Sequence, residues 1–102
     1  MGALQSEVLV ETGMLRAERI TVEGGTGTPW QRCPIAERVL VVQQGRGYLY
    51  RSFGREENRT EVCDGDVVRI PRLAWHRLVA SGDDRIVATF VTAAPFAVED
   101  RT

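Results

Sequence analysis

Residues 65–76 read Gly-Asp-Val-Val-Arg-Ile-Pro-Arg-Leu-Ala-Trp-His. An apolar run from Val67 to Ile70 follows an Asp-Gly turn and ends at Pro71. Because proline cannot donate to a sheet ladder, it ends a strand there. The chain then turns and reaches His76, the only histidine of the protein. The stretch therefore predicts two short strands joined by a proline turn, with an imidazole at the start of the second.

Similar strand patterns recur along the whole chain, with turn residues between them. The expected strands are residues 7–10, 14–22, 38–43, 48–51, 58–62, 67–70, one opening near residue 76, and 85–92. Residues 24–29 contain three glycines and a proline, which exclude a regular ladder and indicate a loop. The tail from Ala93 is expected to be irregular around Pro95. With no helical pattern, this organisation is typical of an antiparallel sandwich or jelly roll.

Length and charge limit the remaining possibilities. At 102 residues the chain is expected to form one domain, residues 1–102, around a single core. The net charge is −1 and the arginines are scattered, so neither nucleic acid nor a membrane is favoured as a partner. Residues 1–13 lack a basic start followed by an apolar stretch, which predicts a cytoplasmic protein. Cys33 and Cys63 are accordingly expected to be thiols rather than a disulfide.

The spacing of several residues resembles the two sequence motifs of the cupin family. The second motif of that family is a glycine, five residues, a proline and a histidine five residues later, as in Gly65, Pro71 and His76. The first runs glycine, five residues, histidine-x-histidine, three or four residues, glutamate, six residues, glycine. Its two frame glycines match Gly25 and Gly45.

The two motifs, residues 25–45 and 65–76, together span residues 25–76, about half of the chain. It implies an all-β fold, a cupin-type jelly-roll barrel (double-stranded β-helix) of antiparallel strands with little or no helix. The gap between the motifs suits the compact single-domain bacterial members of the family. Small members commonly pair their sheets, and exposed strand edges need cover, so a homodimer is expected.

The resemblance also implies a metal site of three histidines and a glutamate, of which this sequence keeps one residue. The four positions hold Gln31, Cys33, Arg38 and His76. Glutamine is a poor ligand for transition metals, and a guanidinium cannot deprotonate to bind one. We therefore expect no cofactor; a bound Fe, Mn, Ni or Zn would have to use His76, Cys33 and Gln31. A shift of one residue would place Glu37 at the position of Arg38, but it would flip the apolar alternation of the following strand.

Arg38 is the most informative of these positions. Pointing inward, it is a fixed positive charge in a low-dielectric barrel and needs an acidic side chain or an anionic ligand. No acidic residue of matching parity lies on its own strand, because Glu37 faces the other way. This favours a ligand carboxylate, phosphate or enolate held by a bidentate fork. The alternative places Arg38 at the barrel mouth with its head in water.

The other candidate site residues surround this anion anchor. His76 is expected to act as a general acid or base, because its ordinary pKa lies near neutrality; the alternative is a partly buried strand residue without chemistry. Cys33 is a nucleophile only if a neighbouring cation favours its thiolate, and otherwise a small buried hydrophobe. The residues expected to bind substrate are Gln31, Cys33, Leu40 and Phe90.

Strand parity leaves two further points open. Trp30 and Trp75 each precede a ligand position, so they are expected to pack between sheets or at a subunit contact rather than in the pocket. The last strand lines the barrel with one of two sets: Phe90 and Thr92, or Val87, Thr89 and Val91.

Three functional classes follow from this resemblance. The first is a metal-independent isomerase, cyclase or lyase acting on a small anionic metabolite, with Arg38 as anchor and His76 as proton carrier. The second is a metal-dependent oxygenase that uses His76 and Cys33, or Glu37 after the register shift. The third is a ligand-binding protein without catalysis. An enzyme of the first class is the expectation.

Overall fold

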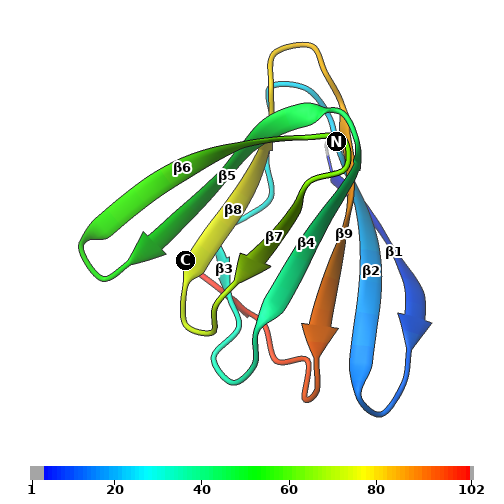
Figure 1. Ribbon diagram of the computed structural model, residues 1–102, viewed down its shortest axis with the longest axis vertical. Coiled ribbons are helices and arrows are strands. Elements are labelled where there is room, and N and C mark those ends of the chain that lie inside the picture. Colours follow the sequence, from blue (N-terminus) through cyan, green and yellow to red (C-terminus); the bar gives the residue numbers. More distant parts are fainter. Residues whose placement is uncertain (1–3, 102) are drawn as a thin grey trace.

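The computed structural model describes residues 4–101, so residues 1–3 and 102 of the expected domain lie outside the described part. Two five-stranded sheets face each other across one core (Figure 1). The strands are β1 (Leu4–Glu11), β2 (Leu15–Val22), β3 (Gln31–Arg32), β4 (Arg38–Gln44), β5 (Arg46–Phe53), β6 (Glu56–Cys63), β7 (Val67–Ile70), β8 (Trp75–Ala80), β9 (Ile86–Ala93) and β10 (Glu99–Asp100). No helix occurs in residues 4–101, which confirms the predicted all-β jelly roll.

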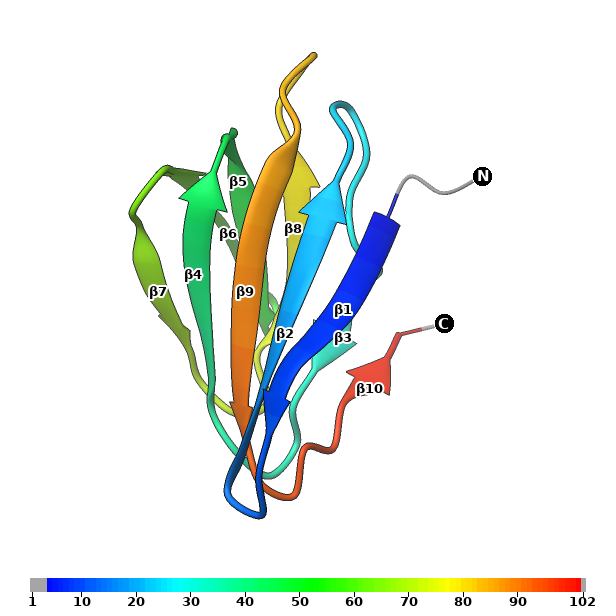
Figure 2. The same ribbon diagram turned by 90° about the vertical axis from the view of Figure 1, so that its right-hand side faces the viewer.

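The two sheets have interleaved strand orders. Sheet A has the order β1-β2-β9-β4-β7, and sheet B has the order β10-β3-β8-β5-β6. Neighbouring strands are antiparallel in both sheets. Seen from the side in Figure 2, sheet A lies in front, and the sheet B strands β3, β5, β6 and β8 lie behind it, with β10 at the lower right. Apart from the β1–β2 and β5–β6 hairpins, consecutive strands therefore cross from one sheet to the other, which encloses the space between them.

Alternation along the strands builds the interior. In β4, residues 38, 40 and 42 face inward and the intervening valines face outward. Register aligns this set with Thr92, Phe90 and Ala88 of β9. This settles the open parity question: Phe90 and Thr92 line the barrel. The buried apolar core consists of Ile20, Val22, Leu40, Val42, Leu49, Val62, Ile70, Ala74, Leu78, Ala80, Ile86, Ala88 and Phe90.

The frame glycine Gly45 has a steric reason. It has φ 103°, in the region that disfavours side chains, and a Cβ there would lie 2.1 Å from the carbonyl oxygen of Arg85. The Asp64 carboxylate accepts a hydrogen bond from its backbone N–H at 2.7 Å. A glycine is therefore needed at this position because the chain passes close to Arg85, at the end of the barrel opposite His76.

Two predictions about the chain ends are corrected. The first strand runs from Leu4 to Glu11 and is longer than the predicted 7–10. The tail is not wholly irregular, because β10 pairs with β3 and adds an edge to sheet B. A two-residue strand has no periodicity to predict it; the Arg32–Glu99 ion pair at 2.5 Å helps to hold it in place.

The two tryptophans do not pack between the sheets as predicted. Trp75 faces the outside of sheet B, where the guanidiniums of Arg32 and Arg101 lie 4.6 and 5.0 Å from its ring centroid. Arg101 also covers Trp30 at 4.7 Å. Cationic side chains thus cover the rings in place of a second apolar layer. Their predicted role at a subunit contact stays a prediction.

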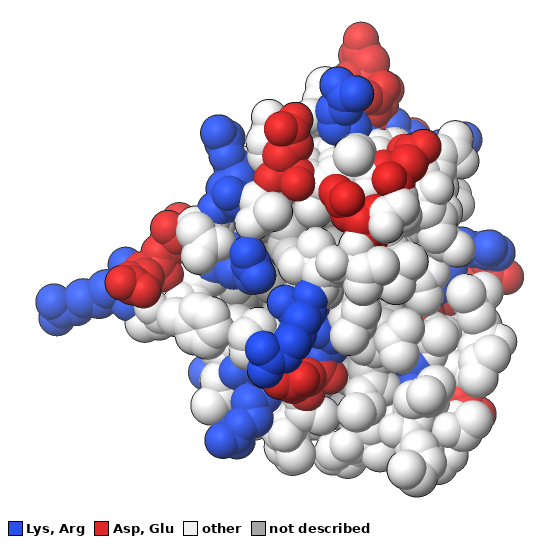
Figure 3. Space-filling view, viewed as in Figure 1, with Lys and Arg blue, Asp and Glu red and all other residues white. Residues whose placement is uncertain are grey.

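The outer face of sheet A is largely uncharged. In Figure 3 the charged side chains gather over the upper loops and the strands at the left, leaving the area over β4, β9 and β2 mostly white. The outward residues there are mainly valines, among them Val39, Val41, Val87 and Val91. The structure holds one chain, so the homodimer stays a prediction.

Two further expectations concern cysteines and membranes. Cys33 is buried and Cys63 is exposed, and both are free thiols, as predicted. In the described part of the chain, no helix has the length and apolarity needed to cross a membrane.

Candidate functional site

Arg38 is the centre of a buried polar cluster at one end of the barrel. Its side chain is only 4% exposed and lies 3.9 Å from the ring centroid of Phe90. Its Nε donates to Thr92 Oγ1 at 3.0 Å. Its Nη1 lies 3.0 Å from Gln31 Oε1 and 3.0 Å from His76 Nε2. Three acceptors from β9, β3 and β8 thus converge on one guanidinium.

The partners of His76 fix its tautomer. Its Nδ1 lies 3.0 Å from the carbonyl oxygen of Ala74, which can only accept, so we assign the proton to Nδ1. Nε2 is then the acceptor for Arg38. Burial, and to a smaller extent the charge of Arg38, lower the pKa of His76 to about 4. Its acid–base role stays a prediction; in this arrangement the ring is neutral near pH 7 and both its nitrogens are hydrogen-bonded.

The third nitrogen of Arg38 has a different surrounding. Nη2 makes no hydrogen bond to any residue in the described range. It is also not one of the fully buried nitrogen atoms that lack a hydrogen-bond partner in this range, which are Arg16 Nε and Arg51 Nε. Both forks of the guanidinium include Nε or Nη1, which already bond to protein. The predicted bidentate fork therefore does not fit this arrangement, and Nη2 alone can receive an anion.

A cavity of about 120 Å³ lies beside Arg38, between the β1–β2 edge of sheet A and the segment that leads into β3. Of the predicted site residues, Gln31, Arg38 and Phe90 line it, whereas Cys33, Leu40 and His76 are buried outside its wall. The complete lining is Leu4, Ser6, Glu18, Ile20, Thr28, Pro29, Gln31, Arg38 and Phe90.

Solved structures share this architecture. An oxalate decarboxylase from Lactobacillus farciminis, determined as a formate complex, aligns with a TM-score of 0.87 over 98% of this chain at 17% identity. A cupin 2 conserved barrel protein from Rhodopseudomonas palustris aligns with a TM-score of 0.82 over 97% of this chain at 19% identity. The chain has a cupin fold.

Another match with this fold is a double-stranded β-helix protein from Klebsiella pneumoniae, with a TM-score of 0.87, 17% identity and coverage of 99% of this chain and 86% of that one. The present chain spans only 32% of the decarboxylase and 67% of the Rhodopseudomonas protein. No protein-family model and no curated protein matches the sequence.

The metal site implied by a cupin fold does not fit the residues as they are arranged. Gln31 and His76 direct their acceptor atoms at Arg38, so a cation would meet the guanidinium instead of open space. Burial raises the pKa of the Cys33 thiol, although Arg38 opposes this, so the thiolate is disfavoured. No cluster of three or more candidate ligands occurs in residues 4–101.

The alternative register with Glu37 as a ligand is wrong. Glu37 lies outside the cupin barrel and forms an ion pair with Arg69. Arg38 is the inward residue, since Val39 faces outward and Leu40 faces inward after it. The apolar alternation of β4 therefore fixed the register that the motif spacing had suggested.

Glu18 is a site residue that the sequence analysis missed. It lies on β2, opposite Phe90 of β9, and lines the same cavity as Arg38. Burial lowers the pKa of Arg38 from its ordinary value, while the charges of Cys33 and Glu18 oppose this shift. The acidic residue that faces Arg38 comes from β2 and not from the strand of Arg38 itself. Alternation in β2, which turns Glu18 to the same side as Ile20, was the available signal.

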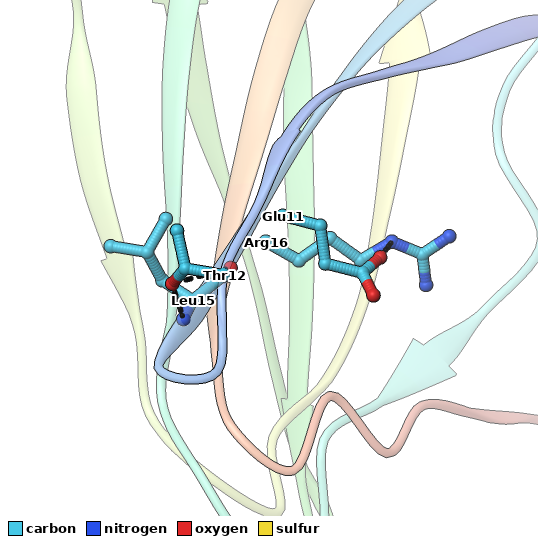
Figure 4. Close-up of polar contacts among 4 residues, drawn as sticks. All are labelled: Glu11, Thr12, Leu15 and Arg16. Atoms are coloured by element: carbon cyan, nitrogen blue, oxygen red, sulfur yellow. Dashed lines mark hydrogen bonds and ion pairs between the residues drawn. The ribbon is translucent and has the colours of Figure 1, made fainter.

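Arg16 completes the charged end of the barrel. It lies opposite Thr92, which is also the register partner of Arg38. Figure 4 shows the charged ends of Arg16 and Glu11 meeting on one side of the β1–β2 hairpin, with Nε 3.3 Å from the carboxylate. Thr12 stabilises the turn by accepting a backbone hydrogen bond from Leu15 at 3.1 Å. Arg16 is thereby held to its own hairpin.

Gln31 has its amide orientation set from outside the cavity. Its Nε2 donates to the Asp100 carboxylate at 3.1 Å, which leaves Oε1 facing Arg38. Asp100 lies on β10, the strand that the sequence did not reveal. The edge of sheet B therefore helps to define the acceptors around the guanidinium.

Proposed function

We propose that this cupin-fold protein binds a small carboxylate at Arg38 without a metal and performs an isomerase, cyclase or lyase reaction on it. The observation that carries the proposal is the position of Nη2. It is the one nitrogen of this buried guanidinium that bonds to no residue between positions 4 and 101, and Arg38 lines the cavity. Hydrogen bonds from a guanidinium to a carboxylate are charge-assisted and about twice as strong as neutral ones.

The cavity restricts the size of the ligand. Its volume is about 120 Å³. A water molecule occupies roughly 30 Å³ of liquid, so the space corresponds to about four waters. This suits an acid of about three carbons, whereas a nucleotide or a sugar phosphate would extend well beyond the cavity. The similarly folded decarboxylase is named for oxalate and was solved with formate, which supports a small carboxylate as the class of ligand.

The same groups support binding of the carboxylate without a metal. Arg38 supplies a permanent positive charge, which its three acceptors hold in place. A positive charge fixed before the ligand arrives stabilises negative charge without the cost of reorganising solvent. An oxygenase that uses His76 and Cys33 would require both residues to leave their present surroundings.

A ligand-binding protein without catalysis is the second candidate. It is favoured by His76, whose two nitrogens are already hydrogen-bonded and whose pKa is lowered to about 4. Turnover therefore requires a proton carrier other than this imidazole in its present state, whereas binding requires only Arg38.

Titration of the ¹⁵N-labelled protein with acetate tests the proposal. Acetate is expected to shift the Arg38 Nε–H resonance and the amides around the cavity in a saturable manner, whereas neutral acetamide should not. Arg38→Met removes the guanidinium and should abolish these shifts. Arg69→Met removes an outward guanidinium from β7 and should leave acetate binding unchanged. Equal titration of the Arg38→Met protein would contradict the proposal.

A further inference from the structure

Glu18 and Arg38 face one cavity from different strands of sheet A. β9 lies between β2 and β4, and its Phe90 is the register partner of Glu18, while the Arg38 guanidinium lies 3.9 Å from the centroid of the same ring. Neighbouring strands are about 4.8 Å apart, so the two backbones are separated by about 10 Å across the sheet. Both side chains line the cavity of about 120 Å³. A cation and a carboxylate therefore flank a space that can hold a molecule of a few atoms.

The Glu18 carboxylate has no bonded partner among residues 4–101. It makes no hydrogen bond or ion pair with a residue in the described range, whereas Glu7, Glu11 and Glu99 each pair with an arginine. The side chain is half-buried, so it can exchange protons with solvent. A free carboxylate at a cavity wall, opposite an anion anchor, is in the position of a general base.

We infer that Glu18 is the proton-transfer residue of this site and that its substrates are small 2-oxo carboxylic acids. The inference rests on the proposed function, because it requires the substrate carboxylate to bind Arg38. A simple carboxylate has no carbon-bound proton that a glutamate can remove at a useful rate. A neighbouring carbonyl changes this, because the electron pair left behind is delocalised as an enolate.

The step balances without a further reactant. The Glu18 carboxylate takes a proton from C3 of the 2-oxo acid, the C–H electron pair forms the C2–C3 double bond, and the carbonyl π pair moves to the oxygen. Ser6 lines the same cavity and carries an O–H donor suited to an enolate oxygen. Return of the proton to carbon, or loss of a leaving group at the next carbon, completes an isomerisation or an elimination.

Pyruvate in D₂O is the probe for this step. Its methyl protons should exchange for deuterium faster with the native protein than in buffer, as followed by proton NMR. Glu18→Gln should lower the protein-dependent exchange at least 100-fold, in line with the usual contribution of a general base. The same variant should bind acetate equally well or more tightly, because a negative charge has left the cavity. Glu11→Gln, which removes a carboxylate that does not line the cavity, should exchange at the native rate.

The outcomes separate the two proposals. Loss of exchange in Glu18→Gln with acetate binding retained supports the inference. Exchange that continues in Glu18→Gln, or native protein that binds acetate and yet does not exchange pyruvate protons, overturns the role of Glu18 and leaves carboxylate binding intact. Native protein that does not bind acetate overturns the proposed function itself.

Discussion

Two adjacent layers of the barrel interior have opposite chemistry. The layer through Leu40 is apolar on β4 and β9, with Leu40 fully buried against Phe90. Two residues away along β4, Arg38 forms a layer that is polar, because its side chain contacts Thr92, Gln31 and His76. The same backbone carries both layers. Burial of apolar surface in one layer thus stabilises the barrel. The neighbouring layer can therefore contain a guanidinium in place of metal ligands without loss of the fold.

Truncation in the apolar layer should have the largest effect on stability. Leu40→Ala removes a fully buried side chain and is expected to lower the free energy of unfolding by about 2–5 kcal/mol in urea denaturation. The outward Val39→Ala on the same strand should cost less than half as much. An equal loss in the two variants would show that β4 is not held by its inner face.

The polar layer should make stability depend on pH through His76. The pKa of this residue is lowered to about 4 from an ordinary value of 6.5, so on acidification the unfolded chain takes up the proton first. The contribution is complete above pH 6.5 and is lost as the pH falls toward 4, for a total of about 3 kcal/mol. Urea denaturation across this range measures it. His76→Gln should flatten this dependence; an unchanged slope would mean that other groups titrate there.

Loss of a single acceptor should have the smallest effect. Thr92→Val removes the hydroxyl that accepts from Arg38 Nε at 3.0 Å and should cost about 1–3 kcal/mol, because the buried N–H loses its partner. Acetate binding should weaken at the same time, since Nη2 is then less firmly positioned. Thr21→Val, on the outer side of β2, should change neither quantity. Native acetate affinity in Thr92→Val would show that this contact does not orient the guanidinium.

The sequence predicted the barrel because its signals are local. The prolines and most of the glycines lie in the turns and loops that end the strands, and alternation in β4 places Arg38 and Leu40 on the inner side. The site could be predicted only in part, because its contacts join residues far apart in the chain. Nothing in the pattern around Gln31 indicates that Asp100 orients it. Alternation in β2 indicates that Glu18 faces inward, but only the pairing of β2 with β9 brings Glu18 to the cavity of Arg38.

The state of His76 could not be predicted either. An isolated histidine suggests an acid or base near neutrality, but a buried ring beside a guanidinium keeps its neutral form. The number of donors and acceptors around the ring decides this, and that number depends on tertiary structure. The same reason explains why the predicted two-bond fork of Arg38 does not fit: Thr92 and Gln31 already occupy the nitrogens that the fork would use.

We propose that the guanidinium of Arg38 takes the place of the metal that the resemblance to cupins implies. Nitrogen NMR of the His76 ring, recorded with and without equimolar Zn²⁺, is the decisive measurement. We expect a proton on Nδ1, an unprotonated Nε2, and no change in either resonance on addition of the metal. A stoichiometric shift of Nε2 with zinc, accompanied by release of Arg38, would contradict it.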